Sequence, residues 1–230
     1  MALQDEIKKE QKKMKDMTLK GKIAYIWDYY KIHIIIGLVI AGSLFVFIRD
    51  WVKASRPVYL NAVVLNTILD YEGDSDIASD FRSYAAIDPD TYNCMIDTSL
   101  RMEIGGGDQM TMATEQKILS LFSAKELDVM VAPEEIVEYY APENAFLDIR
   151  TIISEDQIHT FESAGYPLYY ATCEGQTFPA GFYVGSSAYL HKISEHGTFK
   201  EDDDPVFAFT SCIAHPEAAV QLLEMITIEN

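Results

Sequence analysis

The sequence has few of the cysteines that crosslink small extracellular domains, and it lacks several common catalytic motifs. Only three of its 230 residues are cysteines, so at most one internal disulfide can form. We expect a buried thiol at Cys94 and leave open a bond between Cys173 and Cys212. The chain also lacks the lysine and serine or threonine of a P-loop, the G-x-S-x-G nucleophile elbow and the spacing of an EF-hand. These absences exclude a disulfide framework and point away from nucleotide, hydrolase and calcium chemistry.

Basic residues are scarce in most of the chain. From Val58 onward there are seven Lys or Arg and thirty Asp or Glu, which leaves a net charge of −23. Such a domain repels nucleic acid and anionic lipid surfaces, so we expect neither as its partner. Most of this acidity is expected to be solvated surface, although it can also favour cationic ligands.

One long apolar run is present near the beginning. Residues 32–48 carry no charge, and their only polar side chains are His33 and Ser43. As a helix these residues rise about 26 Å, close to a hydrocarbon core of roughly 30 Å, and tyrosines and a tryptophan flank them at headgroup depth. The charged residues after the run make a poor cleavage site. We therefore predict a transmembrane helix over 32–52, in preference to a signal peptide or a soluble core helix.

The charges around this run predict its orientation. Residues 1–31 contain eight lysines and five acids, whereas only Arg49, Lys53 and Arg56 follow the run closely. The Lys/Arg bias places residues 1–31 in the cytoplasm and residues 57–230 outside the cell membrane, with the lipid bilayer as a partner. Within the basic segment, Thr18 can cap an amphipathic helix that leads into the span.

The extracellular part alternates apolar strands with helices. Strands are predicted at 58–67, 92–97 and 127–132, with helices between them and a helix from Pro133 through Tyr140. Strands that are apolar on both faces are typical of a parallel sheet covered on both sides. Later segments predict a helix near 155–163, strands at "GFYVG" and "VFAFT", and a closing helix at "HPEAAVQLLEMITI". The expected fold class is a single α/β domain with a mostly parallel sheet flanked by helices.

Several stretches resemble the extracellular solute-binding proteins of ABC importers, which have a type II periplasmic-binding-protein fold. "AKELDVMVA" (124–132) and "AFLDIRTI" (145–152) resemble a strand and a following loop of the first lobe. "YLNAVVLNT" resembles its opening strand, "TFPAGFYVG" the passage that returns to the first lobe, and "HPEAAVQLLEMI" a helix that usually begins Asn-Pro-Glu, with His215 in place of the asparagine. The resemblance is loose over 58–228 and specific at 124–152.

The resemblance implies one lobe only. The stretch between "LDIRTI" and "GFYVG" is too short for a second lobe, and the lipobox cysteine of such proteins is replaced by the helical anchor. We therefore expect a non-catalytic binding or accessory module linked to ABC-type uptake of sugars or peptides, with no cofactor and no metal. The alternative is an interaction subunit that docks a transporter component or a full solute-binding protein and has no small-molecule ligand.

If a small molecule binds, the site should lie beyond the carboxyl ends of the parallel strands. The residues expected there are Asn66, Thr67, Asp97, Thr98, Pro133 and Glu134. A concave pocket with convergent polar groups would favour a ligand, and an exposed apolar patch would favour a protein partner.

Other residue patterns are interpreted more plainly. We interpret the glycines at 105–107, which precede a helix, as a flexible loop and not as an anion site. The acidic segment Asp70–Asp76 is interpreted as a surface loop and not as a calcium site. A small hydrolase would need Ser187, His191 and Glu195 together in one cleft. Tyrosines at 139, 140, 166, 169 and 170 are expected at core edges, with a sugar-stacking surface as the alternative.

Overall fold

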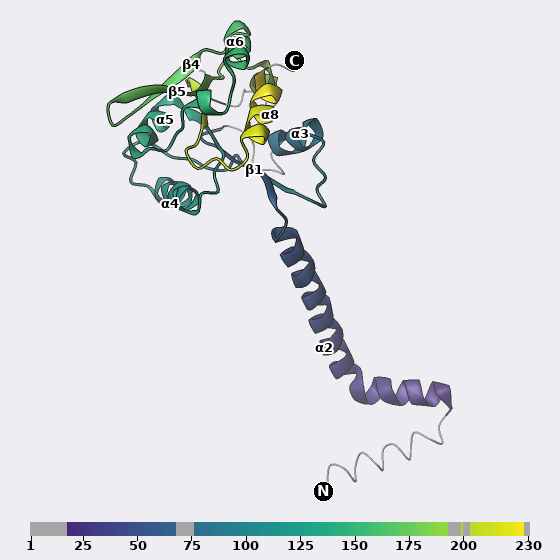
Figure 1. The fold of residues 1–230 in the computed structure, drawn as a ribbon. Helices are drawn as coiled ribbons and strands as arrows, with labels where there is room; N and C mark the ends of the chain where they lie inside the picture. Colours follow the sequence, from purple (N-terminus) through teal and green to yellow (C-terminus); the bar gives the residue numbers. More distant parts are fainter. Residues whose placement is uncertain (1–17, 68–75, 193–198, 200–202, 228–230) are drawn as a thin grey trace. The chain divides into compact units, whose positions relative to one another are not determined.

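The chain divides into two compact units, Met1–Ser55 and Arg56–Asn230. The computed structural model describes residues 18–67, 76–192, 199 and 203–227 (Figure 1). In the described part of the first unit, helix α2 runs from Leu19 to Ala54. The side chain of Thr18 accepts a hydrogen bond from the Gly21 N–H at 3.4 Å, which confirms the predicted cap.

Part of α2 is apolar enough to cross a membrane. The most apolar 18-residue window within Tyr30–Ala54 has a mean hydropathy of 2.3, and none of that window is buried. By length and composition this segment is compatible with a membrane anchor or with a signal sequence. The hydrophobic residues that face outward along it include Ile36, Val39 and Phe47.

The second unit is an α/β domain built on one six-stranded sheet. The strand order is β2-β1-β3-β6-β5-β4. The strands are β1 (Val58–Val64), β2 (Asn93–Asp97), β3 (Val129–Pro133), β4 (Leu168–Cys173), β5 (Gln176–Tyr183) and β6 (Pro205–Phe209). The helices are α3 (Asp76–Tyr84), α4 (Gln109–Ala124), α5 (Glu134–Tyr140), α6 (Glu155–Ser163), α7 (Ala188–Lys192) and α8 (Pro216–Thr227), with short 3-10 turns at Ala141–Glu143 (η1) and Ile149–Thr151 (η2).

The sheet is mixed, so the prediction of a mostly parallel sheet is wrong. Strand β1 pairs in parallel with β2 and β3, but β3–β6, β6–β5 and β5–β4 are all antiparallel. The cause is local. Glu174 and Gly175 both have positive φ, at 51° and 78°, and join β4 to β5 through a two-residue turn. A turn of this kind can only connect antiparallel neighbours.

Helices cover both faces of the sheet, as the sequence predicts. Alternate residues of β1 and β3 point to opposite sides, so Ala62 and Val131 belong to one core and Val63 and Met130 to the other. The first core is closed by α3, α6 and α8, and the second by α4 and α5. Figure 1 shows α4 and α5 on one side of the sheet and α3 and α8 on the other.

Candidate functional site

The carboxyl ends of β1 and β2 bring together several residues of the predicted ligand site. The Asn66 side chain donates to the Met102 carbonyl and accepts from the Met102 N–H, both at 2.9 Å. Thr67 Oγ1 donates to the Thr98 carbonyl at 3.0 Å. Both side chains therefore hold the segment between β2 and α4 against the end of β1.

Asp97, the last residue of β2, is also held by internal partners. Its Oδ1 accepts from the Ser99 N–H at 2.8 Å and from the Ser99 hydroxyl at 2.6 Å, and its other oxygen pairs with Lys117. Burial alone would raise the pKa of Asp97. The hydrogen bonds from Lys117 and Ser99 outweigh burial and keep the pKa below its usual value.

A hollow of about 390 Å³ lies at this edge and is lined by Asn66, Thr67, Arg101, Met102, Glu103, Asp108, Met110 and Thr111. Arg101 donates to the carbonyls of Thr98 and Leu100, and the Asp108 carboxylate accepts from the first N–H groups of α4. Because the Asp108 carboxylate occupies that helix terminus, the glycine loop before it offers no anion site there.

Pro133 and Glu134 make their contacts with other strands. Pro133 ends β3, pairs with Pro205 of β6 and immediately precedes α5. The Glu134 N–H donates to the Asp204 carbonyl at 3.0 Å, and its carboxylate accepts from the Tyr183 hydroxyl of β5. Burial, together with the Glu134 carboxylate, raises the pKa of Tyr183. These two predicted residues thus join β3 to the antiparallel half of the sheet.

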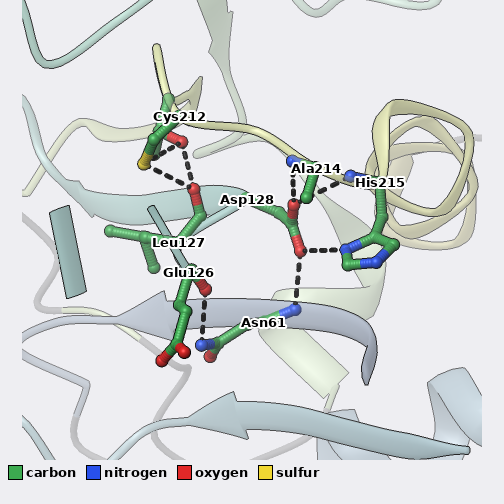
Figure 2. Close-up of polar contacts among 8 residues, drawn as sticks. Asn61, Glu126, Leu127, Asp128, Cys212, Ala214 and His215 are labelled. Carbon is green, nitrogen blue, oxygen red and sulfur yellow. Dashed lines mark hydrogen bonds and ion pairs between the residues drawn. The ribbon is translucent and has the colours of Figure 1, made fainter. Parts of the chain in front are cut away.

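A buried carboxylate organises the opposite end of β3, as Figure 2 shows. Asp128 is 1% exposed. Its Oδ1 accepts from the N–H groups of Ala214 and His215 at 2.7 and 3.0 Å, and its Oδ2 accepts from the Asn61 N–H at 2.9 Å. The His215 ring nitrogen Nδ1 lies 3.1 Å from the same Oδ2. Asp128 therefore links β1, β3 and the start of α8.

A second hollow, of about 610 Å³, lies between α4, α5, η1 and the segment after β6. Its lining comprises Glu115, Leu119, Phe122, Lys125, Tyr139, Tyr140, Glu143, Asn144, Ala145, Ser211 and Cys212. The Cys212 thiol donates to the Leu127 carbonyl at 3.2 Å, so this hollow is near the amino end of β3. The carboxyl ends of the strands, where a ligand site was predicted, lie elsewhere, and the sequence pointed to this hollow only through Tyr139 and Tyr140, as the alternative of a sugar-stacking surface.

The remaining candidate residues occupy ordinary structural positions. Ser187 is fully buried; its hydroxyl donates to the Ile226 carbonyl at 2.6 Å and accepts from the Leu190 N–H. The His191 ring contacts the Gly185 carbonyl at 2.9 Å, while Glu195 and Asp70–Ser75 lie outside the described residues. Among the described side chains, no cluster of three or more His, Cys, Asp or Glu is arranged to hold a metal ion.

The cysteines and tyrosines are also placed. Cys173 and Cys212 are free thiols, so the disulfide that the sequence left open is not formed. Cys94 is partly buried, and burial raises the pKa of its thiol to about 11. Tyrosines 166 and 169 belong to the core and Tyr170 is exposed, whereas tyrosines 139 and 140 line the larger hollow.

Comparisons of the chain with models of protein families, with curated proteins and with solved structures find no match. The resemblance to solute-binding proteins therefore stays a hypothesis based on the residues of this chain.

Proposed function

We propose that this chain is a non-catalytic, single-pass membrane protein whose extracellular α/β domain serves as a binding or accessory module for ABC-type uptake. The observation that carries the proposal is the combination of two features in one chain. Tyr30–Ala54 is a helix long and apolar enough for a bilayer, and none of its most apolar window is buried in the protein. Residues 56–230 form a separate compact unit with two cores of their own.

Charge supports the proposed orientation. The lysines that precede the apolar segment keep the amino terminus in the cytoplasm, and the acidic domain after it faces outward. A domain with a net charge of −23 also stays off the anionic surface of a membrane, which leaves its faces available to partners in solution.

Protease protection tests the anchor and its orientation together. Chains carrying both an amino-terminal and a carboxyl-terminal tag are expressed, and protease is added to intact cells or spheroplasts. We expect loss of the carboxyl-terminal tag and protection of the amino-terminal one. In a matched variant Lys8, Lys9, Lys12 and Lys13 are changed to Gln, which removes half of the lysines before the apolar segment. A larger fraction of its chains should show the reverse protection pattern, because fewer basic residues hold the amino terminus in the cytoplasm. The reverse protection pattern, or a mature chain that starts after Ile48, would contradict the proposal.

The larger hollow favours a binding role for the domain. Its volume of about 610 Å³ lies in the range of roughly 300–1,000 Å³ that is usual for ligand sites, and apolar and polar side chains converge on it. The linked partner would be a transporter component or a full solute-binding protein. Purification of the tagged chain in mild detergent, followed by mass spectrometry, tests this link; repeated recovery of unrelated cytoplasmic proteins alone would count against it.

The alternative function, an interaction subunit without a small-molecule ligand, is favoured by a different observation. Large apolar side chains are exposed on α4 and the loop before it, at Ile104, Met110, Met112 and Leu119. If the domain docks a protein through them, a Met110→Gln/Met112→Gln variant should lose the co-purifying partner. Under the binding proposal this variant retains its partner.

A further inference from the structure

The larger hollow has aromatic walls. Phe122 of α4 and Tyr140 of α5 face each other with ring centroids 6.2 Å apart. Tyr139 meets Tyr140 edge to face at 5.1 Å, and 47% of its surface is exposed. The Tyr140 hydroxyl donates to the Met102 sulfur at 3.8 Å, so its polar group is held in the interior, and only 4% of the Tyr140 surface is exposed.

One stripe of α4 supplies the opposite wall. Glu115, Leu119 and Phe122 follow each other at helical spacing, and all three line the hollow. Leu119 is 56% exposed although it is a large apolar residue. Ile118, on the neighbouring face of the helix, is fully buried in the core. The α4 stripe is thus an apolar surface that the fold leaves open.

Two carboxylates accompany these apolar and aromatic groups. Glu115 comes from α4 and Glu143 from η1, so they reach the hollow from different elements. In the part of the chain that the structure describes, neither forms an ion pair. Burial raises the pKa of Tyr140, and the charge of Glu115 raises it further, which shows that this carboxylate acts on the aromatic wall.

We propose that this hollow binds a small organic cation, an ammonium group carried on an apolar or aromatic body. Aromatic faces attract cations through their quadrupole, and carboxylates beside them add a direct charge attraction. The negative charge of the whole domain increases the local concentration of cations at the hollow. This inference deepens the proposed binding function and rests on it only for the expectation that the domain has a ligand.

Lys125 is the cationic residue of the lining and opposes such a ligand. It caps the end of α4 in a left-handed conformation, with φ of 57°, and its side chain is exposed. Its charge should lower the affinity of the hollow for cations. Its removal should therefore increase that affinity, an effect that damage to the fold would not produce.

The test uses the full chain in an uncharged detergent and three probes with the same benzyl or phenyl body. Benzyltrimethylammonium is the cation, benzyl alcohol the neutral probe and benzenesulfonate the anion. Isothermal titration calorimetry is expected to show saturable binding of the cation, weaker binding of the alcohol and none of the sulfonate. Comparing variants in the same detergent cancels any partition of the probes into the micelle.

The variants assign the binding to the hollow. Glu115→Gln and Glu143→Gln should each raise the Kd of benzyltrimethylammonium about two- to fivefold, the range expected for partly exposed charge pairs. Tyr139→Leu should weaken binding similarly, and Tyr139→Phe should retain it, because only the aromatic face is needed. Lys125→Gln should lower the Kd about two- to threefold. The matched control is Glu135→Gln, which removes a charge from an exposed position of α5 outside the hollow.

The outcomes are distinct. The proposal is supported if the hollow prefers the cation, if Glu115→Gln lowers the affinity for it and if Lys125→Gln raises that affinity. The control Glu135→Gln should leave the affinity unchanged. Equal or better binding of benzyl alcohol would indicate a neutral ligand such as a sugar and overturn it. An equal loss in Glu135→Gln, or no saturable binding of the cation, would also overturn it. The protease-protection result does not depend on these titrations. If the hollow does not bind the cation, the proposed topology is unaffected, and if the topology proves wrong, the titrations still test the hollow.

Discussion

Removal of the Asp128 carboxylate should destabilise the domain more than any single surface change. In Asp128→Ala three backbone N–H groups lose their acceptor, those of Asn61, Ala214 and His215. Asn61 is buried, so its N–H incurs the full penalty of an unsatisfied donor, about 1–3 kcal/mol. Ala214 is exposed and His215 partly exposed, so water can replace the carboxylate there at about 0.5–1 kcal/mol each.

The expected decrease in the free energy of unfolding is therefore about 2–5 kcal/mol for Asp128→Ala. Asp128→Asn keeps one acceptor oxygen but places an NH2 group toward either Asn61 or the start of α8, so a decrease of about 2 kcal/mol is expected. Asp90→Asn is the matched control: the Asp90 side chain is 88% exposed and should change stability by less than about 0.5 kcal/mol.

Urea denaturation of residues 56–230, followed by circular dichroism, measures these differences, since this segment forms a compact unit of its own. Two results would refute the reasoning. One is a decrease below about 1 kcal/mol for Asp128→Ala, which would mean that the bonds to Asp128 contribute no more than bonds to water. The other is a larger decrease for the asparagine variant than for the alanine variant.

Three further predictions concern the antiparallel half of the sheet. In Gly181→Ala the new Cβ would lie 2.0 Å from the Phe207 carbonyl oxygen, so β5 and β6 must separate. Urea denaturation should show that the free energy of unfolding falls by about 3 kcal/mol. The control is Gly107→Ala, where the space is open and the change should be less than about 0.5 kcal/mol. Glu174→Asn places a residue that tolerates positive φ in the hairpin turn, and a gain of about 0.5 kcal/mol is expected; a loss would contradict the turn assignment. Burial raises the pKa of Tyr169 to about 12. Between about pH 10 and 12 the folded state then holds a proton that the unfolded state has released, so the free energy of unfolding should fall as pH rises; ultraviolet titration at 295 nm and denaturation at each pH check this.

The first half of the domain could be predicted from sequence because its signals are local. The strands at the beginning are mostly apolar, and the helix predicted between the second and third strands begins at Gln109 with Asp108 as its cap. The closing helix, α8, was predicted because its apolar residues recur at helical spacing. Periodicity alone was sufficient for α8, which buries the face that its pattern marks, whereas α4 buries Thr111, Thr114 and Ile118 and leaves Leu119 exposed.

The sheet order could not be predicted in the same way. The residues of β4 alternate between buried and exposed, as expected of a strand at the sheet edge, but the two residues that turn the chain back are a glutamate and a glycine. Glu-Gly is a weaker turn signal than Asn-Gly or Asp-Gly, so the hairpin was missed and the later strands were assigned to a parallel sheet. Strand β6, which lies between β3 and β5, depends on pairing across the whole domain and has no local signal of direction.

The site illustrates the limits of the rule that ligands bind at the carboxyl ends of parallel strands. The polar residues predicted at those ends lie together at β1 and β2, but Asn66 and Thr67 bind the backbone of the segment that follows β2. Their position at the sheet edge was visible in the sequence, whereas the atoms they contact were set by how that segment folds back.

The larger hollow had two signals in the sequence, the tyrosines at 139 and 140 and one face of α4, and both were ambiguous. Glu115, Leu119 and Phe122 mark a face of α4 that contains both a charge and apolar groups, which is typical of the boundary between core and solvent on many helices. Only the structure shows that α5 and η1 border the same hollow without covering this face, so that Leu119 stays exposed in a hollow that Tyr139 and Tyr140 also line. An apolar residue that remains open beside carboxylates without an ion pair among the described residues differs from an ordinary boundary position, because burying it against a neighbouring helix would also bury those charges. A cation with an apolar body can cover the apolar residue and neutralise the carboxylates at the same time. The charge of the probe, more than its size, should therefore decide whether it binds.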